Sequence, residues 1–492
     1  MKTAPTAAAA RHLSLATLLV ALAVGSGACG ARRTPDLERI FERARTSEGK
    51  RPVIVIPGIL GSRLVNRRTG EVVWPSAFRS SDDGLALPVS PDLSANGDDL
   101  VASEIIEKAK LARLAPDVYV YYELLDALAR FGNYREGDWD APSPGGDRDT
   151  FYVFAYDWRR DNAETARELV GRVEELKRKL GRPDLKFNVI AHSMGGLVAR
   201  YAAMYGDADL PAEGATPRPD WAGSRHLAKI FMFGTPNEGS AEAFATLMEG
   251  YSVTEGLRRR VRLLNKLSRE DALTIPSLYQ LLPRGAQAEF LDENLRPVAG
   301  IDLYDPETWR RYGWAAVNDA RYRERFARGE VQDEEGPPLA RSLEQLDSYF
   351  AAALRRARRF HAAIDADAQD APVPLFVFGG DCEETLRAPV VLRDERRNVW
   401  LTLTSARSFR TSAGAKVERR DAVRAMYEPG DGRVTRRSLL GQRANAPRAS
   451  ALYDTPLPVA YAVFACDLHS DLQNNKILQN NALTLLVNEL FN

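Results

Sequence analysis

Six short segments of the chain are apolar almost throughout and end at turn residues. They lack the alternation of apolar and polar positions that marks a strand with one face in solvent, so each is predicted to be a strand buried on both faces. The segments are residues 51–58, 151–156, 186–191, 227–233, 373–380 and 461–465. Such strands are typical of parallel sheets, in which helices cover both faces.

Helical patterns lie between these segments. In residues 163–180, leucine and valine recur at helical spacing, and Gly181 and Pro183 end the pattern. Two further helical patterns occupy residues 197–204 and 476–491. Strands that alternate with helices predict an α/β fold, a mostly parallel central sheet flanked by helices.

Two long stretches interrupt this alternation. Residues 64–148 are rich in turn residues and carry a helical pattern at 121–131, whereas residues 241–371 are mostly helical and rich in arginine. Neither stretch has internal repeats. We therefore expect one sheet domain, residues 51–240 and 372–492, with a smaller insertion after the first strand and a helical cap or lid.

The N-terminus has the pattern of an export signal. Lys2 and Arg11 precede an apolar run at residues 13–24, which is too short to span a bilayer and is followed by small residues. Residues 1–29 are therefore predicted to be a signal peptide, and the protein to be exported to the periplasm or cell surface. Residues 30–50, charged and weakly helical, are predicted to be a tether.

Cys29 ends the run of small residues and resembles the lipidated cysteine of a bacterial lipobox, although Ser26 stands where leucine is usual. Two interpretations stay open. Either Cys29 is lipidated and anchors the protein to the membrane, or it is an incidental residue near the cleavage point.

The balance of charges argues against a nucleic-acid-binding protein, and the spacing of cysteine and histidine argues against a zinc site. Of 492 residues, 67 are Lys or Arg and 67 are Asp or Glu, so no net charge attracts nucleic acid. Cys382 and Cys466 can form one disulfide in an oxidising compartment, although the sequence alone does not prove the pairing. No Cys/His spacing indicates a zinc site, and no cofactor is expected.

Residues 191–195, Ala-His-Ser-Met-Gly, form a G-x-S-x-G motif in which alanine replaces the first glycine. In α/β hydrolases this motif turns a strand sharply into a helix and exposes the serine as a nucleophile. Here the motif follows a predicted buried strand and precedes a helical pattern. Ser193 is therefore predicted to be the nucleophile rather than an ordinary helix-capping serine.

The chain has five histidines, and elimination leaves one as the general base. His12 lies in the export segment, and His192 adjoins the serine and would point away from it. His226 precedes a strand, and His361 lies in a helical stretch. His469 follows a late buried strand, as the order Ser, acid, His of the fold requires.

The acid must lie between the serine and the base in sequence and must accept a hydrogen bond from the imidazole. Asp431 lies in a tight turn between two glycines, and Asp381 directly follows the strand at 373–380. Asp467 and Asp471 are too close to the base in sequence. Asp431 is favoured, with Asp381 as the alternative.

An oxyanion hole requires two hydrogen-bond donors aimed at the developing negative oxygen. The backbone N–H of Met194, at the start of a helix, is predicted to be one of them. The loop at residues 57–62, Pro-Gly-Ile-Leu-Gly-Ser, is predicted to carry the other, because its glycines let the backbone turn its amides inward.

Five motifs appear in a fixed order along the chain after residue 50. Together they resemble the lecithin:cholesterol acyltransferase family, which includes lysosomal phospholipase and phospholipid:diacylglycerol acyltransferase members. The motifs are Pro-Gly-Ile-Leu-Gly-Ser-Arg-Leu at 57–64, Tyr-Asp-Trp-Arg at 156–159, Ala-His-Ser-Met-Gly at 191–195, Gly-Thr-Pro-Asn-Glu-Gly-Ser at 234–240 and Gly-Asp-Gly-Arg-Val at 430–434.

The resemblance implies a catalytic triad of Ser193, Asp431 and His469, with the amides of Leu60 and Met194 as oxyanion donors. It also implies a lipid ester substrate and a peripheral association with a membrane, in addition to the lipid anchor that Cys29 would provide.

In this family the segment after the first strand helps to bind lipid, which makes Trp74 a candidate lipid contact, with core packing as the alternative. Trp158 is a candidate support or substrate contact near the site. The family's eukaryotic members carry a disulfide loop after the first strand, and this chain has no cysteine between residues 29 and 382.

The expected activity is transfer of a fatty acyl group from a phospholipid or another lipid ester, through an acyl-serine, to an alcohol or to water. An esterase or lipase that uses water alone is the nearest alternative. Cleavage of amides or thioesters, and a non-catalytic surface lipoprotein, are the more distant ones.

Overall fold

The computed structural model describes residues 34–75, 84–110, 117–252, 266–285, 288–330, 342–368, 370–442 and 453–488. The predicted signal peptide, Cys29 and the first part of the predicted tether lie outside these residues. Among the residues described, no helix has both the length and the apolar character needed to cross a membrane.

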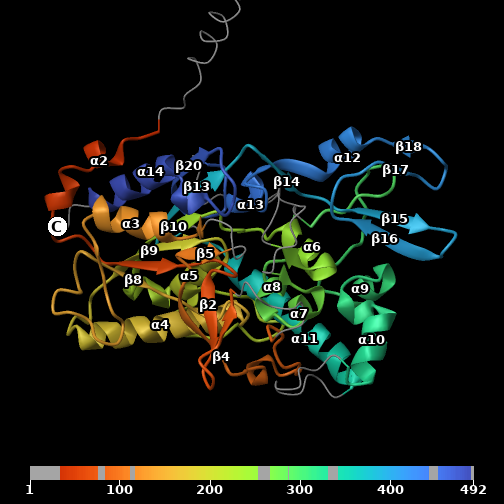
Figure 1. Ribbon diagram of the computed structural model, residues 1–492, viewed down its shortest axis with the longest axis horizontal. Helices are drawn as coiled ribbons and strands as arrows, with labels where there is room; N and C mark the ends of the chain where they lie inside the picture. Colours follow the sequence, from red (N-terminus) through yellow and green to blue (C-terminus); the bar gives the residue numbers. More distant parts are fainter. Residues whose placement is uncertain are drawn as a thin grey trace, which may run out of the picture.

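A seven-stranded sheet lies in the left half of the molecule as drawn in Figure 1, beside the helices of the predicted cap. Its order is β20-β13-β10-β9-β1-β8-β7, and every neighbouring pair is parallel. The strands are β1 (Val53–Ile56), β7 (Arg135–Glu136), β8 (Thr150–Val153), β9 (Phe187–His192), β10 (Leu227–Phe233), β13 (Leu375–Gly380) and β20 (Val459–Ala465). The predicted α/β-hydrolase fold with a parallel sheet is confirmed. Only β7 lacked a signal in the sequence, because it has two residues.

The side chains of β1 divide the core into two layers. Ile54 and Ile56 join a cluster with α4 (Asn162–Lys179) and α5 (Met194–Tyr205). Val53 and Val55 join a cluster with α3 (Tyr122–Arg130) and α14 (Lys476–Val487). Figure 1 shows α3 and α14 above the sheet and α4 below it. Helices on both faces explain why the strand is apolar throughout.

The insertion after β1 contributes a small antiparallel sheet of its own, of order β3-β2-β4. Its strands are β2 (Ser62–Asn66), β3 (Val72–Trp74) and β4 (Leu100–Ile105), and a second hairpin joins β5 (Lys108–Lys110) to β6 (Asp117–Tyr119). The insertion then returns to the core through α3. It places β2 directly after the loop that the sequence singles out at residues 57–62.

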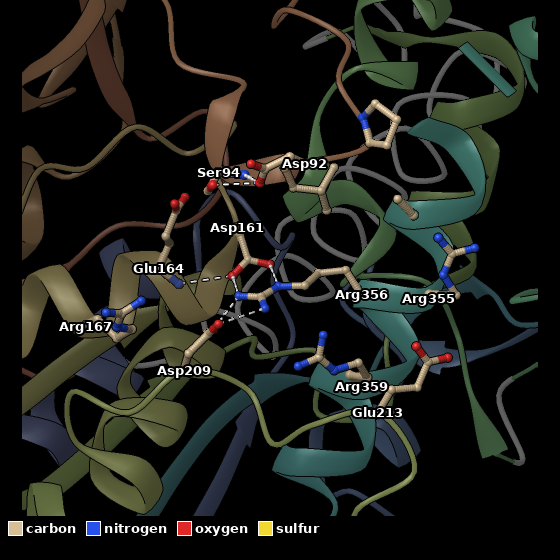
Figure 2. Close-up of a pocket in the computed structure, with 13 residues that line it drawn as sticks. Asp92, Ser94, Asp161, Glu164, Arg167, Asp209, Glu213, Arg355, Arg356 and Arg359 are labelled. Carbon is tan, nitrogen blue, oxygen red and sulfur yellow. Dashed lines mark hydrogen bonds and ion pairs between the residues drawn. The ribbon is translucent and has the colours of Figure 1, made fainter. Parts of the chain in front are cut away.

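The cap consists mainly of helices. They are α6 (Ala241–Glu249), α7 (Arg269–Leu273), α8 (Pro276–Tyr279), α9 (Pro306–Tyr312), α10 (Ala320–Ala327) and α11 (Leu343–Ile364), with a short hairpin of β11 (Tyr251–Ser252) and β12 (Lys266–Leu267). Their apolar side chains merge with the core cluster of α4 and α5. On α11, Arg356 also bonds Asp161 at the start of α4 and Asp209 in the loop after α5 (Figure 2).

A group of hairpins between β13 and β20 carries no clear signal in the sequence. It pairs β14 (Glu383–Leu386) with β19 (Tyr427–Gly430), β15 (Val390–Asp394) with β16 (Val399–Leu403), and β17 (Phe409–Arg410) with β18 (Lys416–Val417), and it includes α12 (Arg419–Met426) and α13 (Arg436–Leu439). The strands are short, and charged residues interrupt them. Their buried side chains pack with residues of the cap in a third cluster.

Part of the predicted tether is packed against the core. Residues 34–50 form α2 (Leu37–Ile40) and η1 (Ala44–Thr46), and Leu37 and Phe41 are 4% and 3% exposed in the cluster of α3. Residues 34–50 of the predicted tether therefore pack against the core. Two apolar side chains four residues apart lie on one face of a helical turn and can be buried together.

Candidate active site

Ser193 lies where β9 turns into α5, at the carboxyl edge of the sheet. Its backbone has φ 52° and ψ −124°, a conformation that costs a residue with a side chain about 1–3 kcal/mol. Its N–H donates to the carbonyl of Phe233 on the neighbouring strand at 2.7 Å. The adjoining strand therefore holds the strained turn, which directs Oγ away from the sheet.

His469 lies in the loop that follows β20, and its ring contacts the serine. Nε2 is 2.9 Å from Ser193 Oγ, and Nδ1 is 2.8 Å from Asp431 Oδ2. Since a carboxylate only accepts, Nδ1 carries the proton, and Nε2 is free to accept the proton of the serine hydroxyl. Gly234 makes room for the ring: its φ is 60°, and a Cβ there would lie 2.9 Å from Nδ1.

Asp431 follows β19 and is 1% exposed. Besides the imidazole, its carboxylate accepts the N–H groups of Arg433 at 3.0 Å and Val434 at 2.7 Å. Its carbonyl accepts the N–H of His469 at 2.8 Å. The structure thus brings Asp431 to the base, whereas the alternative, Asp381, lies beside Arg436 at 3.9 Å.

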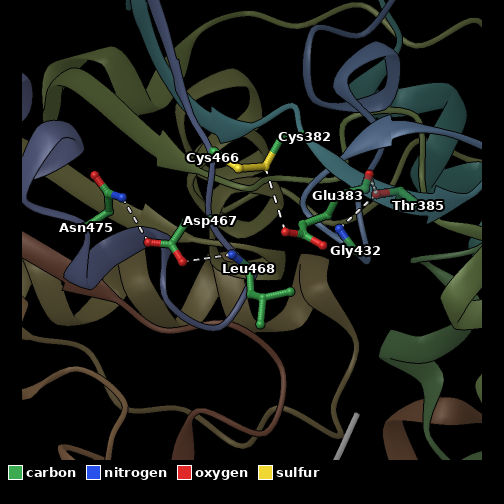
Figure 3. Close-up of a disulfide and its surroundings, with 8 residues drawn as sticks. All are labelled: Cys382, Glu383, Thr385, Gly432, Cys466, Asp467, Leu468 and Asn475. Carbon is green, nitrogen blue, oxygen red and sulfur yellow. Dashed lines mark hydrogen bonds between the residues drawn. A yellow bond between two sulfur atoms is a disulfide. The ribbon is translucent and has the colours of Figure 1, made fainter. Parts of the chain in front are cut away.

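A disulfide ties the loop of the base to the end of β13 (Figure 3). Cys382 is two residues after β13 and Cys466 directly follows β20, and their Cα atoms are 5.2 Å apart. Both cysteines are exposed. In the described part of the chain, these two cysteines and Glu383 form the group that is close enough together to offer three ligands to a metal ion. The disulfide uses the sulfur atoms of both cysteines.

Two backbone amides near Ser193 lack an acceptor in the part of the chain that the structure describes. Within the described residues, no hydrogen bond is found for the N–H of Leu60 or of Met194. Met194 is the first residue of α5, where an N–H has no partner in the helix. Leu60 has φ 63°. Both predicted oxyanion donors are therefore free to bind a substrate oxygen.

Aromatic side chains support the loop that carries Leu60. The indole N–H of Trp74 donates to the carbonyl of Leu60 at 2.9 Å, and that of Trp158 to the carbonyl of Ser62 at 3.2 Å. The hydroxyl of Tyr156 donates to the carbonyl of Pro57 at 2.9 Å. Trp74 and Trp158 are 3% and 0% exposed, so their positions favour a supporting role over the predicted contact with lipid or substrate.

The other histidines of the described chain bond elsewhere. Burial lowers the pKa of His192 and of His361 to about 3, and that of His226 to about 4. None of the three contacts Ser193 Oγ through its ring nitrogens. They are neutral at physiological pH and do not compete with His469 for the proton of the nucleophile.

A hollow of about 360 Å³ between α4 and α11 contains none of the triad residues (Figure 2). Its lining is mainly arginine and acidic side chains, several of which are paired with one another. The hollow therefore belongs to the junction of the cap with the core.

Comparison with known proteins relates part of this chain to one family. Residues 94–310 match the family described as "Lecithin:cholesterol acyltransferase". "Lecithin-cholesterol acyltransferase-like 4" of Arabidopsis thaliana is 23% identical over 259 residues, which are 47% of this chain and 42% of that protein. The chain thus spans less than half the length of this curated relative.

A solved structure supports the fold assignment. "The crystal structure of Tle4-Tli4 complex" contains a chain that aligns with a TM-score of 0.54 and 15% sequence identity. The alignment covers 89% of this chain and 98% of that chain. At this identity the similarity concerns the fold.

Proposed function

We propose that this chain, which residues 94–310 relate to the lecithin:cholesterol acyltransferase family, is a serine-dependent acyltransferase or lipase. It transfers a fatty acyl group from a phospholipid or another lipid ester to an alcohol or to water. The observation that carries the proposal is the hydrogen-bonded series from Ser193 Oγ through His469 to Asp431, at 2.9 and 2.8 Å.

In the first half of the reaction, Ser193 Oγ attacks the ester carbonyl while His469 Nε2 accepts its proton. Asp431 stabilises the imidazolium that forms. The carbonyl oxygen becomes negative and accepts hydrogen bonds from the amides of Leu60 and Met194. When the intermediate collapses, the C–O bond to the leaving alcohol breaks, the alcohol takes the proton from His469, and the acyl group stays on the serine.

In the second half, an alcohol or a water molecule enters. His469 accepts its proton as its oxygen attacks the acyl-serine, and the same two amides bind the second oxyanion. Collapse returns the proton to Ser193 and releases an ester or a free fatty acid. The acceptor decides whether the outcome is transfer or hydrolysis, and the lipid nature of the donor is supported by the family relation.

We also propose that the protein acts outside the cytoplasm, either free or anchored through Cys29. The signal-like residues 1–29 support export, and a disulfide between Cys382 and Cys466 suits an oxidising compartment. The mass of the mature protein tests both forms. An N-terminal diacylglyceryl-cysteine would indicate the anchor, and a mature protein that retains residues 1–29 would contradict export.

Product analysis tests the reaction. The purified protein is incubated with a phospholipid labelled in its acyl chain, with and without a long-chain alcohol. Labelled ester of the alcohol indicates transfer, and labelled fatty acid alone indicates hydrolysis. If neither product depends on Ser193, as judged with a Ser193→Ala variant, the proposal is wrong.

A further inference from the structure

A continuous line of hydrogen bonds joins the loop of the oxyanion amides to the base. The N–H of Gly58 donates to the hydroxyl of Tyr121 at 2.9 Å, and this hydroxyl is 2.9 Å from His192 Nδ1. His192 Nε2 is 3.0 Å from the backbone carbonyl of His469. Tyr121 and His192 are 2% and 8% exposed, and neither has a part in the mechanism above.

The direction of every bond in this line is determined. His192 is neutral, because burial and the neighbouring ring of His469 lower its pKa to about 3, so it carries one ring proton. The carbonyl of His469 can only accept, and Nε2 therefore holds that proton. Nδ1 must then accept, so the hydroxyl of Tyr121 donates to it and accepts from Gly58. Each donor and each acceptor in the line is satisfied once.

One end of the line lies against the nucleophile. A Cβ on Gly58 would be 2.8 Å from Ser193 Cβ, so the loop runs directly over the serine. Gly58 also accepts, through its carbonyl, the N–H of Gly61 at 3.1 Å, which closes the turn that contains Leu60. A shift of Gly58 would therefore carry the amide of Leu60 with it.

The other end lies on the base itself. Besides the bond to the carbonyl of His469, a second link leads from the same part of the chain. The carbonyl of Val120 accepts Gln473 Nε2 at 2.6 Å and Asn474 Nδ2 at 3.0 Å. These two residues follow the base by four and five positions, so Val120, just before α3, and His192 both hold the base loop.

We propose that Tyr121 and His192 are positioning residues that hold the amide of Leu60 and the imidazole of His469 at a fixed separation across Ser193. The inference rests on the proposed function. Acyl transfer loses rate when an oxyanion donor or a base moves by a fraction of an ångström. The hydrogen-bonded residues beside the base should be uncharged, because the rings of His192 and His469 are 4.9 Å apart. A positive charge on His192 would repel the imidazolium that forms on His469 during the reaction.

The cap contains a matched control. The hydroxyl of Tyr304 is 2.6 Å from His361 Nδ1, and His361 Nε2 is 2.7 Å from the carbonyl of Gln280. Burial also lowers the pKa of His361 to about 3. This second line has the same chemistry but does not end on a residue of the triad. Loss of a tyrosine hydroxyl that bonds a buried, neutral histidine can therefore be compared at two places in the molecule.

The experiment measures kcat and KM on a p-nitrophenyl ester for Tyr121→Phe and Tyr304→Phe, normalised to the sites that a fluorophosphonate labels. We expect Tyr121→Phe to lower kcat about tenfold, or about 1.4 kcal/mol, with KM within about twofold. Tyr304→Phe should leave both within about twofold. If the two variants have equal kcat, the proposal is wrong. If the wild-type protein itself shows no Ser193-dependent turnover, the proposed function is wrong instead.

If Tyr121→Phe does not fold, a second pair of variants, His192→Gln and His192→Asn, tests the proposal. Glutamine at position 192 places an amide N–H near the position of Nε2 and can keep the bond to the base. Asparagine is shorter and places its amide near Nδ1, so it keeps only the bond to Tyr121. His192→Gln should retain at least about threefold more kcat than His192→Asn. Equal kcat values in this pair would also overturn the proposal.

Discussion

Two lines of the same composition, tyrosine, histidine and backbone carbonyl, lie in different parts of this molecule. Tyr121 and His192 lie at the catalytic edge of the sheet, and Tyr304 and His361 lie in the cap. Their hydrogen bonds are 2.9 and 3.0 Å in the first case and 2.6 and 2.7 Å in the second. Burial keeps both histidines neutral.

The two lines differ in what they join. The first begins at Gly58 and ends on His469, so it spans the two loops that flank the nucleophile. The second ends on Gln280 and fastens the end of α11 to the segment after α8. A buried neutral histidine thus serves as a structural link in both places. Its effect on turnover depends on the carbonyl that it holds.

The largest effect is expected for Ser193→Ala, because this substitution removes the nucleophile. Of the two lines of hydrogen bonds, only the one through Tyr121 and His192 adjoins the site of the reaction. Turnover of a lipid ester should fall at least about 10⁴-fold, because nucleophile and base act as a unit. The folded state should persist, as judged by the thermal midpoint. Activity that survived this substitution would show that the loops joined by Tyr121 and His192 do not surround the reacting group.

The next effect concerns the disulfide, which holds the base loop in parallel with His192. Replacing both Cys382 and Cys466 by serine should lower the free energy of unfolding by about 2–4 kcal/mol. It should also lower kcat several-fold, because the loop before His469 is then held by hydrogen bonds alone. The measurements are urea denaturation and ester turnover of the wild type, with and without reductant, and of the double variant. Unchanged kcat in the double variant would mean that hydrogen bonds alone suffice to place the base.

A third effect concerns stability alone, through its pH dependence, to which His192 and His361 should contribute equally. The pKa of His192 and of His361 is about 3 in the folded protein, against an ordinary value of 6.5. At a pH between these values, each of the two histidines binds a proton in the unfolded chain but not in the folded protein. The contribution of each neutral histidine to the free energy of unfolding is therefore fully present above pH 6.5 and is lost as the pH falls towards 3. The loss is about 1.4 kcal/mol per pH unit for each histidine.

Urea denaturation between about pH 7.5 and pH 4.5 measures this slope. His192→Gln and His361→Gln should each reduce the slope of unfolding free energy against pH by the contribution of one histidine, about 1.4 kcal/mol per pH unit. A slope unchanged in either variant would mean that the corresponding histidine takes up a proton in the folded state.

The smallest effect is expected for the hydroxyl in the cap. Tyr304→Phe should lower the free energy of unfolding by about 1 kcal/mol, because one hydrogen bond is lost. Tyr152→Phe is a control, since its buried hydroxyl donates to the carbonyl of Gly146 at 2.9 Å and should cost a similar amount. Neither substitution should change kcat. A change of kcat in Tyr304→Phe would remove the distinction between the two lines.

The catalytic edge could be predicted from sequence because its parts are local or ordered along the chain. The apolar run before Ser193 and the helix after it define the turn, and the order of serine, acid and histidine selects His469. The glycine-flanked turn favours Asp431 over Asp381 in the sequence, and the positions of the two carboxylates in space decide between them. The strand β19, which leads to Asp431, is short and carries a weak pattern.

The supports of the site could not be predicted, because they come from contacts between distant segments. Tyr121 and His192 are 71 positions apart, and His192 and His469 are 277 apart. The resemblance to the family makes Trp74 a candidate lipid contact, and the sequence alone does not separate this role from core packing. Its bond to the carbonyl of Leu60 exists only once β3 folds back beside β2.

The mass of the protein during turnover tests most directly whether Ser193 carries the acyl group. The protein is mixed with a slowly hydrolysed ester, quenched in acid and digested, and the peptide that contains Ser193 is identified by mass spectrometry. This peptide should gain the mass of the acyl group, and in an Asp431→Asn variant it should gain that mass far more slowly. A protein that turns over the ester while Ser193 stays unmodified at every time would contradict this role of Ser193.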